Sequence, residues 1–445
     1  VYISMGSFNI YGAQSTFGIM DELVYPYNTI TGSYLQLHQY SMLTVRLRFD
    51  VMWLAYYQSL ANINLIISHL DNSRELFSSD KEYDLYYGEL LGLRAFIHFD
   101  LMRIFGLSEW NEENASKHTV PFQLQFTHQA PTQLTYADAE KQLINDIDAS
   151  IAYLAQDPIR GVEDPDFDRI SNIDGYWNYR NLHFNYYAAL ALKARILQWS
   201  GDCENAATIA RSVIDGAFDS GAVSWVDCAS LLNTGPASEK DWSFTSEHIF
   251  ALDVKELDSN YSTMLFAQNA LSSNSVYSIP EKIVKSQLYP DVDSYGQMSG
   301  AEDVRGPAFQ LKFYSNSYVC YKLYCESTSA YRIRNKRPLI KISEMYYILA
   351  ENAIKQGDNK AALGFVNAVR KARNIQEDLP DVANAMDELN KEYYREFINE
   401  GQLFFWLKHH GLSDYLGAEY MNLTADMLIL PYPEDELIYG RVQDK

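Results

Sequence analysis

The chain has 445 residues, of which 47% are hydrophobic and 14% aromatic, enough to bury a large core. Its formal net charge is 36 − 58 = −22 at pH 7, which argues against a polyanionic partner such as nucleic acid. No run approaches the roughly 18 consecutive apolar residues that a membrane span needs, and no apolar leader follows Val1. The composition predicts a globular protein.

The aromatic content says more about function than the cysteine content does. The four cysteines are too sparse for a disulfide scaffold, and Cys320 and Cys325 lack a second Cys or His pair at zinc spacing. They predict isolated thiols or a local bridge, with no metal or other cofactor. The 34 Tyr and 7 Trp are more informative, because such rings combine an apolar face with a polar group and recur where proteins hold amphipathic ligands. Any single ring is still more often a packing residue.

Amphipathic periods predict the first helices in chain order. Residues 1–45 mix Gly, Ser, Thr, Asn and Tyr, which predicts surface loop around at most one helix near 16–25. From Arg46 an apolar stripe at three- and four-residue steps predicts a long helix, and a second stripe over 90–104 predicts another that stops at Gly106. After an extended segment at 119–122, Thr135 is the predicted cap of a third helix. The stretch 156–182 is predicted to be a long loop.

Two later segments repeat each other. Gly201 and Asp202 lie at the same spacing within their apolar pattern as Gly357 and Asp358. A glycine in a left-handed turn ends one helix and an aspartate caps the next, while alanines allow close packing. This pattern is typical of the antiparallel helix pairs of tetratricopeptide-like repeats.

Periodicity is lost between the two copies. Residues 216–338 are rich in Gly, Ser, Pro, Asn and Tyr, with short strands predicted at 248–252 and 318–324. Irregular insertions on a helical scaffold are usually functional, so we expect the ligand there. The chain is therefore predicted to be one domain over 1–445, with helical parts at 46–215 and 339–445 flanking the insertion 216–338.

Several segments, in order along nearly the whole chain, resemble the SusD/RagB family of Bacteroidetes-type outer-membrane proteins. LRAFIHFDLMRIFG at 93–106 is similar to the family's LRAxxxFDLxRxFG, and further similar segments lie at 57–62, 120–121, 188–195, 247–250, 343–353, 367–370 and 430–436. The segment 392–407 matches only in part, because Leu403 and Trp406 replace the usual arginine and aspartate. If that arginine and aspartate form an ion pair in the family, replacing both together is physically consistent. Replacing only one would leave an unpaired charge, which costs about 3 to 5 kcal/mol if buried.

The resemblance implies a mainly α, tetratricopeptide-like scaffold with a loop-rich, short-strand insertion. It also implies a non-enzymatic surface protein that captures oligosaccharides and passes them to a SusC-type TonB-dependent transporter. The lipid anchor on a cysteine and the outer-membrane location rest on the resemblance alone, since the earliest cysteine is Cys203.

Three aromatic and polar clusters are candidate saccharide contacts, because a sugar needs flat rings flanked by amides, carboxylates or arginine. The binding face is predicted from the loops at 20–40, 156–182 and 260–318. The candidate residues are Tyr25, Tyr27, Asn28, Tyr34, Tyr176, Trp177, Asn178, Tyr179, Tyr289, Asp291, Tyr295 and Arg305. Asp291 and Asp293 alone are too few carboxylates to indicate calcium. Trp53, Trp199 and Trp406 lie in helical stripes and are predicted core residues.

Other functions stay open at this point. The chain contains no HExxH, GxSxG, P-loop or GxGxxG motif, which favours binding over catalysis. A helical glycoside hydrolase remains an alternative because its two carboxylates need no local motif. A peptide-capturing family member and a tetratricopeptide adaptor are the others.

Overall fold

A computed structural model describes residues 1–27, 36–37, 39–161, 172, 175–265, 278–296, 300–314, 316–411 and 425–442. Its helices are α1 (Tyr2–Met5), α2 (Ile19–Glu22), α4 (Arg46–Leu70), α5 (Asp80–Phe105), α6 (Tyr136–Tyr153), α8 (Tyr186–Trp199), α9 (Cys203–Asp219), α10 (Cys228–Leu232), α11 (Leu257–Leu265), α12 (Glu281–Ile283), α13 (Ile342–Lys355), α14 (Asn359–Ala372), α15 (Ala385–Glu396), α16 (Gln402–His410) and α17 (Glu434–Tyr439). Its strands are β1 (His118–Phe122), β2 (Thr132–Thr135), β3 (His248–Asp253), β4 (Ser278–Pro280), β5 (Leu311–Tyr314), β6 (Ser317–Cys320), β7 (Lys336–Lys341) and β8 (Arg441–Val442).

Short helical turns connect these elements. They are η1 (Met42–Val45), η2 (Arg74–Leu76), η3 (Leu154–Gln156), η4 (Pro158–Arg160), η5 (Arg180–Leu182), η6 (Ala237–Glu239), η7 (Thr245–Glu247), the π-helical η8 (Val284–Leu288) and η10 (Ala425–Leu428). Within its described part, the predicted loop at 156–182 contains only the last residue of η3 and the short turns η4 and η5.

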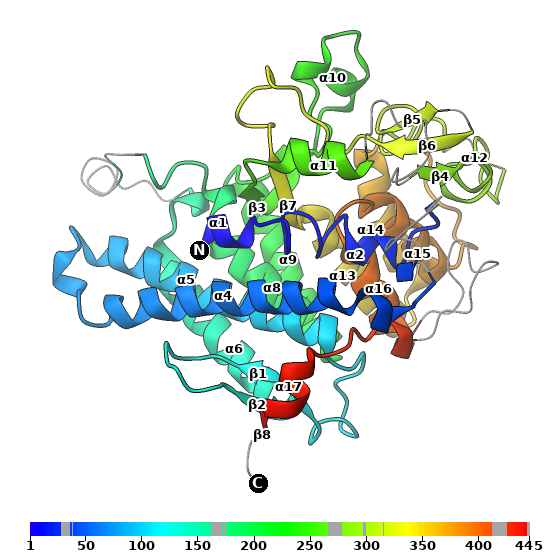
Figure 1. Ribbon diagram of the computed structural model, residues 1–445. Coiled ribbons are helices and arrows are strands. Elements are labelled where there is room, and N and C mark those ends of the chain that lie inside the picture. Colours follow the sequence, from blue (N-terminus) through cyan, green and yellow to red (C-terminus); the bar gives the residue numbers. More distant parts are fainter. Residues whose placement is uncertain are drawn as a thin grey trace.

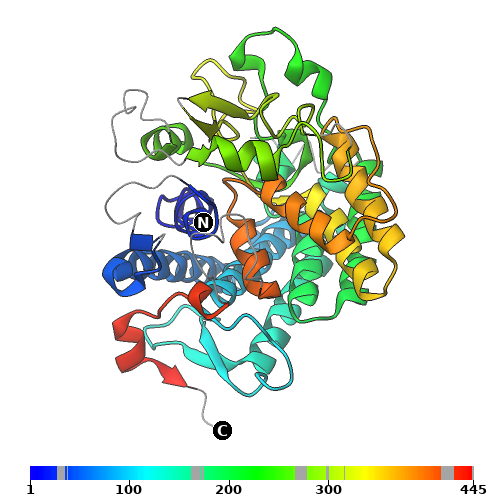
Figure 2. The same cartoon turned by 90° about the vertical axis from the view of Figure 1, so that its right-hand side faces the viewer.

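The helices form a continuous stack, so the mainly α, repeat-like prediction is confirmed (Figures 1 and 2). The contacts run from α4 to α5, α6, α8, α9, α13, α14 and α15 in succession. Each helix therefore buries its apolar stripe against a neighbour, as in helical repeats. None of the helices in the described ranges is long and apolar enough to cross a membrane.

The turns inside the repeated pairs have the predicted chemistry. Gly201 and Gly357 have φ of 93° and 76°, and Asp202 and Asp358 cap α9 and α14 by accepting backbone N–H groups. Glycine adopts this left-handed conformation without a Cβ clash. The predicted cap at Thr135 is also present on α6.

Two glycines bring α5 close to its neighbours. A Cβ at Gly92 would lie 2.0 Å from the Phe184 ring, and one at Gly88 would lie 2.7 Å from Leu154. Ser150 on α6 donates a hydrogen bond to the Gly88 carbonyl at 2.7 Å. Here glycine, despite its poor helix propensity, permits an approach that any larger residue would block.

The N-terminal segment differs from its prediction as surface loop, because every residue of 10–27 is buried. It runs between α4 and α11 through the middle of the molecule (Figures 1 and 2). Asp21 of α2 accepts backbone hydrogen bonds from Asn399 and Gly401, and the Tyr11 hydroxyl donates to Asp100. Turn hydrogen bonds within the segment pair most of its backbone N–H groups, so a Gly- and Ser-rich stretch tolerates burial.

Short sheets lie beside the helices. β3 pairs antiparallel with β7, and β4, β6 and β5 form a second antiparallel sheet. The strand predicted at 248–252 corresponds to β3, and that at 119–122 to β1. The strand predicted at 318–324 ends early, at Cys320, and a turn follows in which the Tyr324 N–H bonds to the Tyr321 carbonyl. In the third sheet β8 pairs with β2, which brings the C-terminal segment to β1 and β2.

A buried ion network, centred on Glu396 at the end of α15, joins the insertion to the scaffold. The Glu396 carboxylate binds Lys341 at 2.7 Å, Arg373 at 2.7 Å and Arg305 at 3.2 Å. All four side chains are almost fully buried. Burial alone would raise the pKa of Glu396, but Arg373 and Lys341 outweigh it and hold that pKa well below its usual range.

The predicted core tryptophans are confirmed, since Trp53, Trp199 and Trp406 are all buried. Trp406 stacks on Tyr393 with ring centroids 3.9 Å apart, and its Nε1 donates to Asn390 at 2.8 Å. Leu403 is fully buried nearby on α16. The two apolar substitutions in the 392–407 segment are thus absorbed by packing. All four cysteines are free thiols, which leaves no bridge between Cys320 and Cys325.

Candidate functional site

The first predicted cluster is interior. Tyr25 and Tyr27 are buried, and their hydroxyls donate to the Tyr394 carbonyl at 3.0 Å and to Asp21 at 3.4 Å. They fasten the N-terminal segment to the end of α15 and expose almost no ring surface, so, contrary to prediction, they offer no platform to a ligand. Asn28 and Tyr34 lie outside the described residues.

The second cluster is divided between core and surface. Trp177 is buried against Tyr86, and Tyr176 stacks on the same ring at 5.5 Å. The Trp177 ring therefore has almost no exposed surface to offer a ligand, contrary to prediction. Tyr179 is 58% exposed and meets Tyr331 edge to face at 5.5 Å, while Asn178 is exposed beside it.

The third cluster is divided in the same way. Tyr289 is buried, and Arg305 has no exposed surface because it pairs with Asp303 and Glu392 at 2.7 Å each. Both are structural residues, which corrects their predicted ligand role. Asp291 and Tyr295 are exposed, and the Tyr295 hydroxyl donates to Glu388 at 3.4 Å.

A concave aromatic site that the residue predictions missed lies in the insertion, and we call it the aromatic groove. Its volume is about 670 Å³. The aromatic residues lining it are Trp242, Phe309, Phe313, Tyr314, Tyr321 and Tyr324. α10 and the β4–β6–β5 sheet, which contribute to it, lie at the same end of the molecule (Figure 1). The aromatic density of 309–324 was the sequence signal that could have identified it.

A small separate core forms the floor of the groove. Trp242 stacks on Phe309 with centroids 4.1 Å apart and an interplanar angle of 9°, and both rings pack with Leu231, Phe244 and Val304. This cluster is distinct from the main core of the helical stack. The floor is therefore rigid independently of any ligand.

Exposed rings form the rim. Phe313 and Tyr314 on β5 are 50% and 45% exposed. The Tyr314 and Tyr321 hydroxyls are hydrogen-bonded at 2.5 Å, and the Tyr321 and Tyr324 rings are 5.2 Å apart. This arrangement presents flat apolar faces next to hydroxyl groups, which suits an amphipathic ligand.

Two lysines supply the charge in the groove. Lys240 is buried and its ammonium donates to the Ser230 carbonyl and to both oxygens of Asn233 at 2.6 to 3.0 Å. Lys312 on β5 places its Nζ 5.2 Å from the Trp242 ring centroid. Burial lowers the pKa of Lys312 from its usual value.

A second cavity, the polar cavity, lies beside the groove and shares Leu231 with it. Its volume is about 410 Å³, and its charged lining residues are Asp227, Glu239, Asp241, Arg332 and Lys336. Tyr179 lines it, and among the described residues it is the one predicted site residue that lines either cavity. Burial raises the pKa of Asp241 to about 6, although Thr245 donates two hydrogen bonds to its carboxylate.

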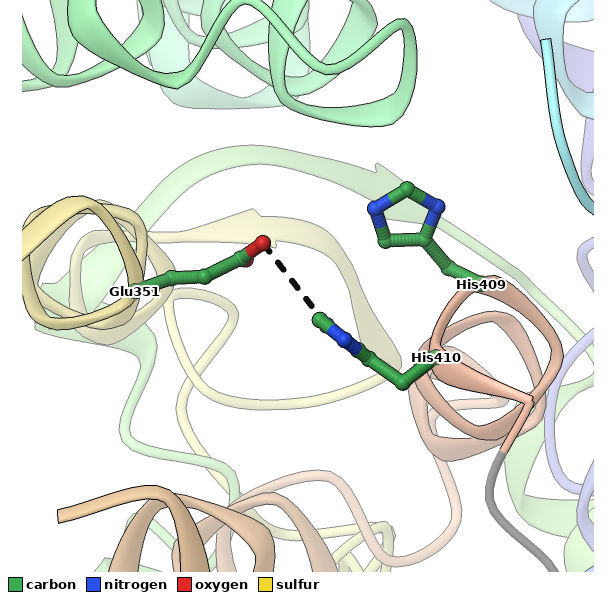
Figure 3. A group of neighbouring side chains, drawn as sticks. All are labelled: Glu351, His409 and His410. Carbon is green, nitrogen blue, oxygen red and sulfur yellow. Dashed lines mark ion pairs between the residues drawn. The ribbon is translucent and has the colours of Figure 1, made fainter. Parts of the chain in front are cut away.

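Apart from the two cavities, Glu351 of α13 and His409 and His410 of α16 lie together in a carboxylate–histidine group (Figure 3). Burial lowers the pKa of His409 to about 4 and that of His410 to about 3, so both imidazoles are neutral at pH 7. The Glu351 carboxylate already meets Lys355 at 3.4 Å and accepts a hydrogen bond from Gln198. His409 stacks on Trp199 at 4.8 Å, so the cluster belongs to the packing of the scaffold.

Comparisons with known proteins agree with this architecture. A family profile described as "Starch-binding associating with outer membrane" matches residues 4–163, and one described as "SusD family" matches residues 230–416. A search of curated proteins found no match.

Solved structures show the same fold. A SusD superfamily protein from Bacteroides thetaiotaomicron is 19% identical with a TM-score of 0.76, covering 99% of this chain and 96% of its own. One from Bacteroides vulgatus is 22% identical with a TM-score of 0.72, covering 98% and 94%. A SusD-like carbohydrate binding protein from Bacteroides vulgatus is 14% identical with a TM-score of 0.62, covering 91% and 79%.

The two profiles together span most of the chain, and five of the predicted family segments, at 57–62, 93–106, 188–195, 343–353 and 367–370, lie in α4, α5, α8, α13 and α14 of the helical stack. The chain belongs to the SusD/RagB-like family.

Proposed function

We propose that this protein captures saccharides in the aromatic groove. The observation that carries the proposal is the groove itself, in which exposed rings alternate with hydroxyl and ammonium groups over a rigid apolar floor. Sugar rings have weakly polar faces bordered by hydroxyls, so they stack on aromatic faces and hydrogen-bond at the edges. Tyr314 and Tyr321 offer both kinds of contact side by side.

The family supports a binding role. SusD-like proteins are binding proteins, and a structural relative is described as carbohydrate binding. The aromatic groove has the chemistry of a binding site, whereas a glycoside hydrolase would need two carboxylates flanking the scissile bond. No Asp or Glu lines the groove among the residues that the structure describes.

Delivery to a transporter completes the proposal. Family resemblance supports a lipid-anchored position at the outer-membrane surface, beside a SusC-type TonB-dependent transporter that receives the bound glycan. The family profile over residues 4–163 carries a description that associates it with the outer membrane. The helical stack would then hold the groove at a fixed place above the membrane.

Affinity electrophoresis against a panel of neutral and acidic polysaccharides, followed by calorimetry on each hit, tests the binding role. We expect Tyr314→Ala to weaken binding on the order of tenfold, because it removes an exposed stacking face. Tyr439→Ala is the matched control, since Tyr439 is equally a surface tyrosine but lies on α17, outside the groove.

Two results would contradict the proposal. The first is that no glycan of the panel binds while peptides do, which would favour a peptide-capturing protein. The second is release of shorter products from any glycan by the purified protein, which would favour a hydrolase.

A further inference from the structure

The charge of the aromatic groove is opposite to that of the whole chain. The protein carries a formal charge of −22, yet the charged groups that line the groove are Lys240 and Lys312, with no carboxylate among the described lining residues. The polar cavity next to it has three carboxylates against two cations. A local positive potential in so acidic a protein favours an anionic ligand over a neutral one.

The two lysines are not equivalent. Three oxygen acceptors already take the three N–H donors of Lys240, so it contributes charge and holds the 230–240 loop. Lys312 has no hydrogen bond or ion pair with any residue that the structure describes, and its ammonium faces the Trp242 and Phe309 rings. Its three donors are therefore available to a ligand.

The surroundings of Lys312 confirm that its charge is uncompensated. Desolvation is the cause that lowers its pKa, and no neighbouring carboxylate in the described structure offsets this effect. Two acids lie close to the groove without lining it: Glu326 accepts a 3.5 Å hydrogen bond from the Tyr324 hydroxyl, and the Glu239 carboxylate lies beside Gly235. A ligand anion would thus restore the favourable environment that Lys312 loses by burial.

Lys312 lies next to Tyr314, one of the rings on which a sugar would stack. Side chains two residues apart on a strand point to the same face, so Lys312 and Tyr314 of β5 lie side by side. A sugar ring stacked near Tyr314 would therefore hold an acidic substituent within reach of the Lys312 ammonium. The Tyr314–Tyr321 hydroxyl pair would meet the ring hydroxyls.

We infer that the aromatic groove selects anionic saccharides, whose carboxylate or sulfate group binds the Lys312 ammonium while the sugar ring stacks on the tyrosines. This inference rests on the proposed saccharide capture and adds the class of glycan. Lys312 is the specificity-determining residue, and the tyrosines supply affinity common to charged and neutral sugars.

Two matched polymer pairs test the inference by calorimetry at low salt. One pair is polygalacturonate and the same polymer with its carboxyl groups reduced to alcohols; the other is dextran sulfate and dextran. We expect the anionic member of at least one pair to bind about tenfold more tightly than its neutral partner, as for a hydrogen bond to a charged group. Whichever pair shows the preference identifies the acidic group.

Lys312→Met removes the charge and keeps an unbranched side chain over the Trp242 ring. We expect it to reduce the preference to within about twofold, whereas Lys141→Met, a change at a 76%-exposed side chain on α6, should retain it. The preference of the wild type should also shrink as salt rises to about 0.5 M.

Three outcomes would overturn the inference. Equal binding of charged and neutral partners, weakened alike by Tyr314→Ala, would leave saccharide capture intact but make the groove a neutral-sugar site. A preference that survives Lys312→Met would place the anion elsewhere. Failure of all four polymers to bind would reject the anionic class, while the wider panel still decides on saccharide capture.

Discussion

The ion network around Glu396 and the aromatic groove both gather positive charge, but only the network supplies its own anions. Arg305, Arg373 and Lys341 are almost fully buried, and each lies within 3.2 Å of a Glu396 oxygen. Lys312 is half-buried and has no carboxylate partner in the described structure. A fully buried charge is tolerated only when paired, whereas a charge at the rim of a cavity keeps part of its hydration.

This difference separates structural from functional cations. The network residues come from the insertion, β7, the end of α14 and α15, so their pairing holds the insertion on the scaffold. The groove cations lie on the insertion alone, between α10 and β5. We therefore expect substitutions in the network to change stability and substitutions in the groove to change binding.

The largest expected effect is that of Glu396→Ala. It would leave Arg373 and Lys341 without their shared carboxylate in a buried site, so we expect a loss of about 3 to 5 kcal/mol in the free energy of unfolding. Denaturant titration followed by circular dichroism measures it. Lys371→Ala, which breaks an exposed pair with Asp378, is the control and should cost less than about 1 kcal/mol. Similar small losses for both variants would show that the network does not hold the fold.

A smaller effect is expected from the pH dependence of Glu392. Burial alone would raise the pKa of Glu392, but Arg305 and Arg395 outweigh it and hold that pKa at about 2. Because the folded pKa lies below the usual value, the stabilisation is present above about pH 5 and is lost as pH falls toward 2. Glu392→Gln lacks this ionisation.

The stability advantage of wild type over Glu392→Gln should therefore shrink by about 2 kcal/mol between about pH 5 and about pH 3. Parallel denaturant titrations of both proteins measure this difference, in which other titrating groups cancel. An advantage that stays constant across this range would mean that Glu392 has an ordinary pKa in the folded protein.

The smallest expected effect is that of Tyr321→Phe, a substitution in the aromatic groove. It removes the hydroxyl that is 2.5 Å from that of Tyr314, and the pair is solvent-accessible, so the unfolding free energy should change by less than about 1 kcal/mol. We expect the affinity for the best-bound glycan to fall about two- to fivefold, because Tyr314 loses an orienting contact. Calorimetry measures the affinity, with Tyr439→Phe as the control. A stability loss above about 2 kcal/mol would place this hydroxyl pair among the structural contacts.

Local sequence patterns predicted much of the scaffold. The starts or ends of the helices at Arg46, Gly106 and Thr135 follow from periodicity and capping, which involve residues within one helical turn of each other. The paired turns at Gly201 and Gly357 were visible for the same reason. Order of motifs along the chain was sufficient to identify the family.

The candidate site was harder to predict because burial depends on distant neighbours. Tyr25, Tyr289 and Arg305 have the composition of a sugar site, yet packing against remote segments removes them from the surface. The groove lies in the 216–338 insertion, where the sequence led us to expect the ligand, but its rings were not among the candidate residues.

The sequence by itself determined the helices, their caps, the repeat and the family, because these depend on contacts between residues close in the chain. Only the tertiary structure decided that the N-terminal segment is buried, since turns pair its backbone and the backbone N–H groups of Asn399 and Gly401 pair the Asp21 carboxylate. It alone also brought Trp242 against Phe309 and left Lys312 with no carboxylate partner among the residues that the structure describes. Charge pairing is a property of positions in space, so identical lysines become structural or available according to what folding places beside them.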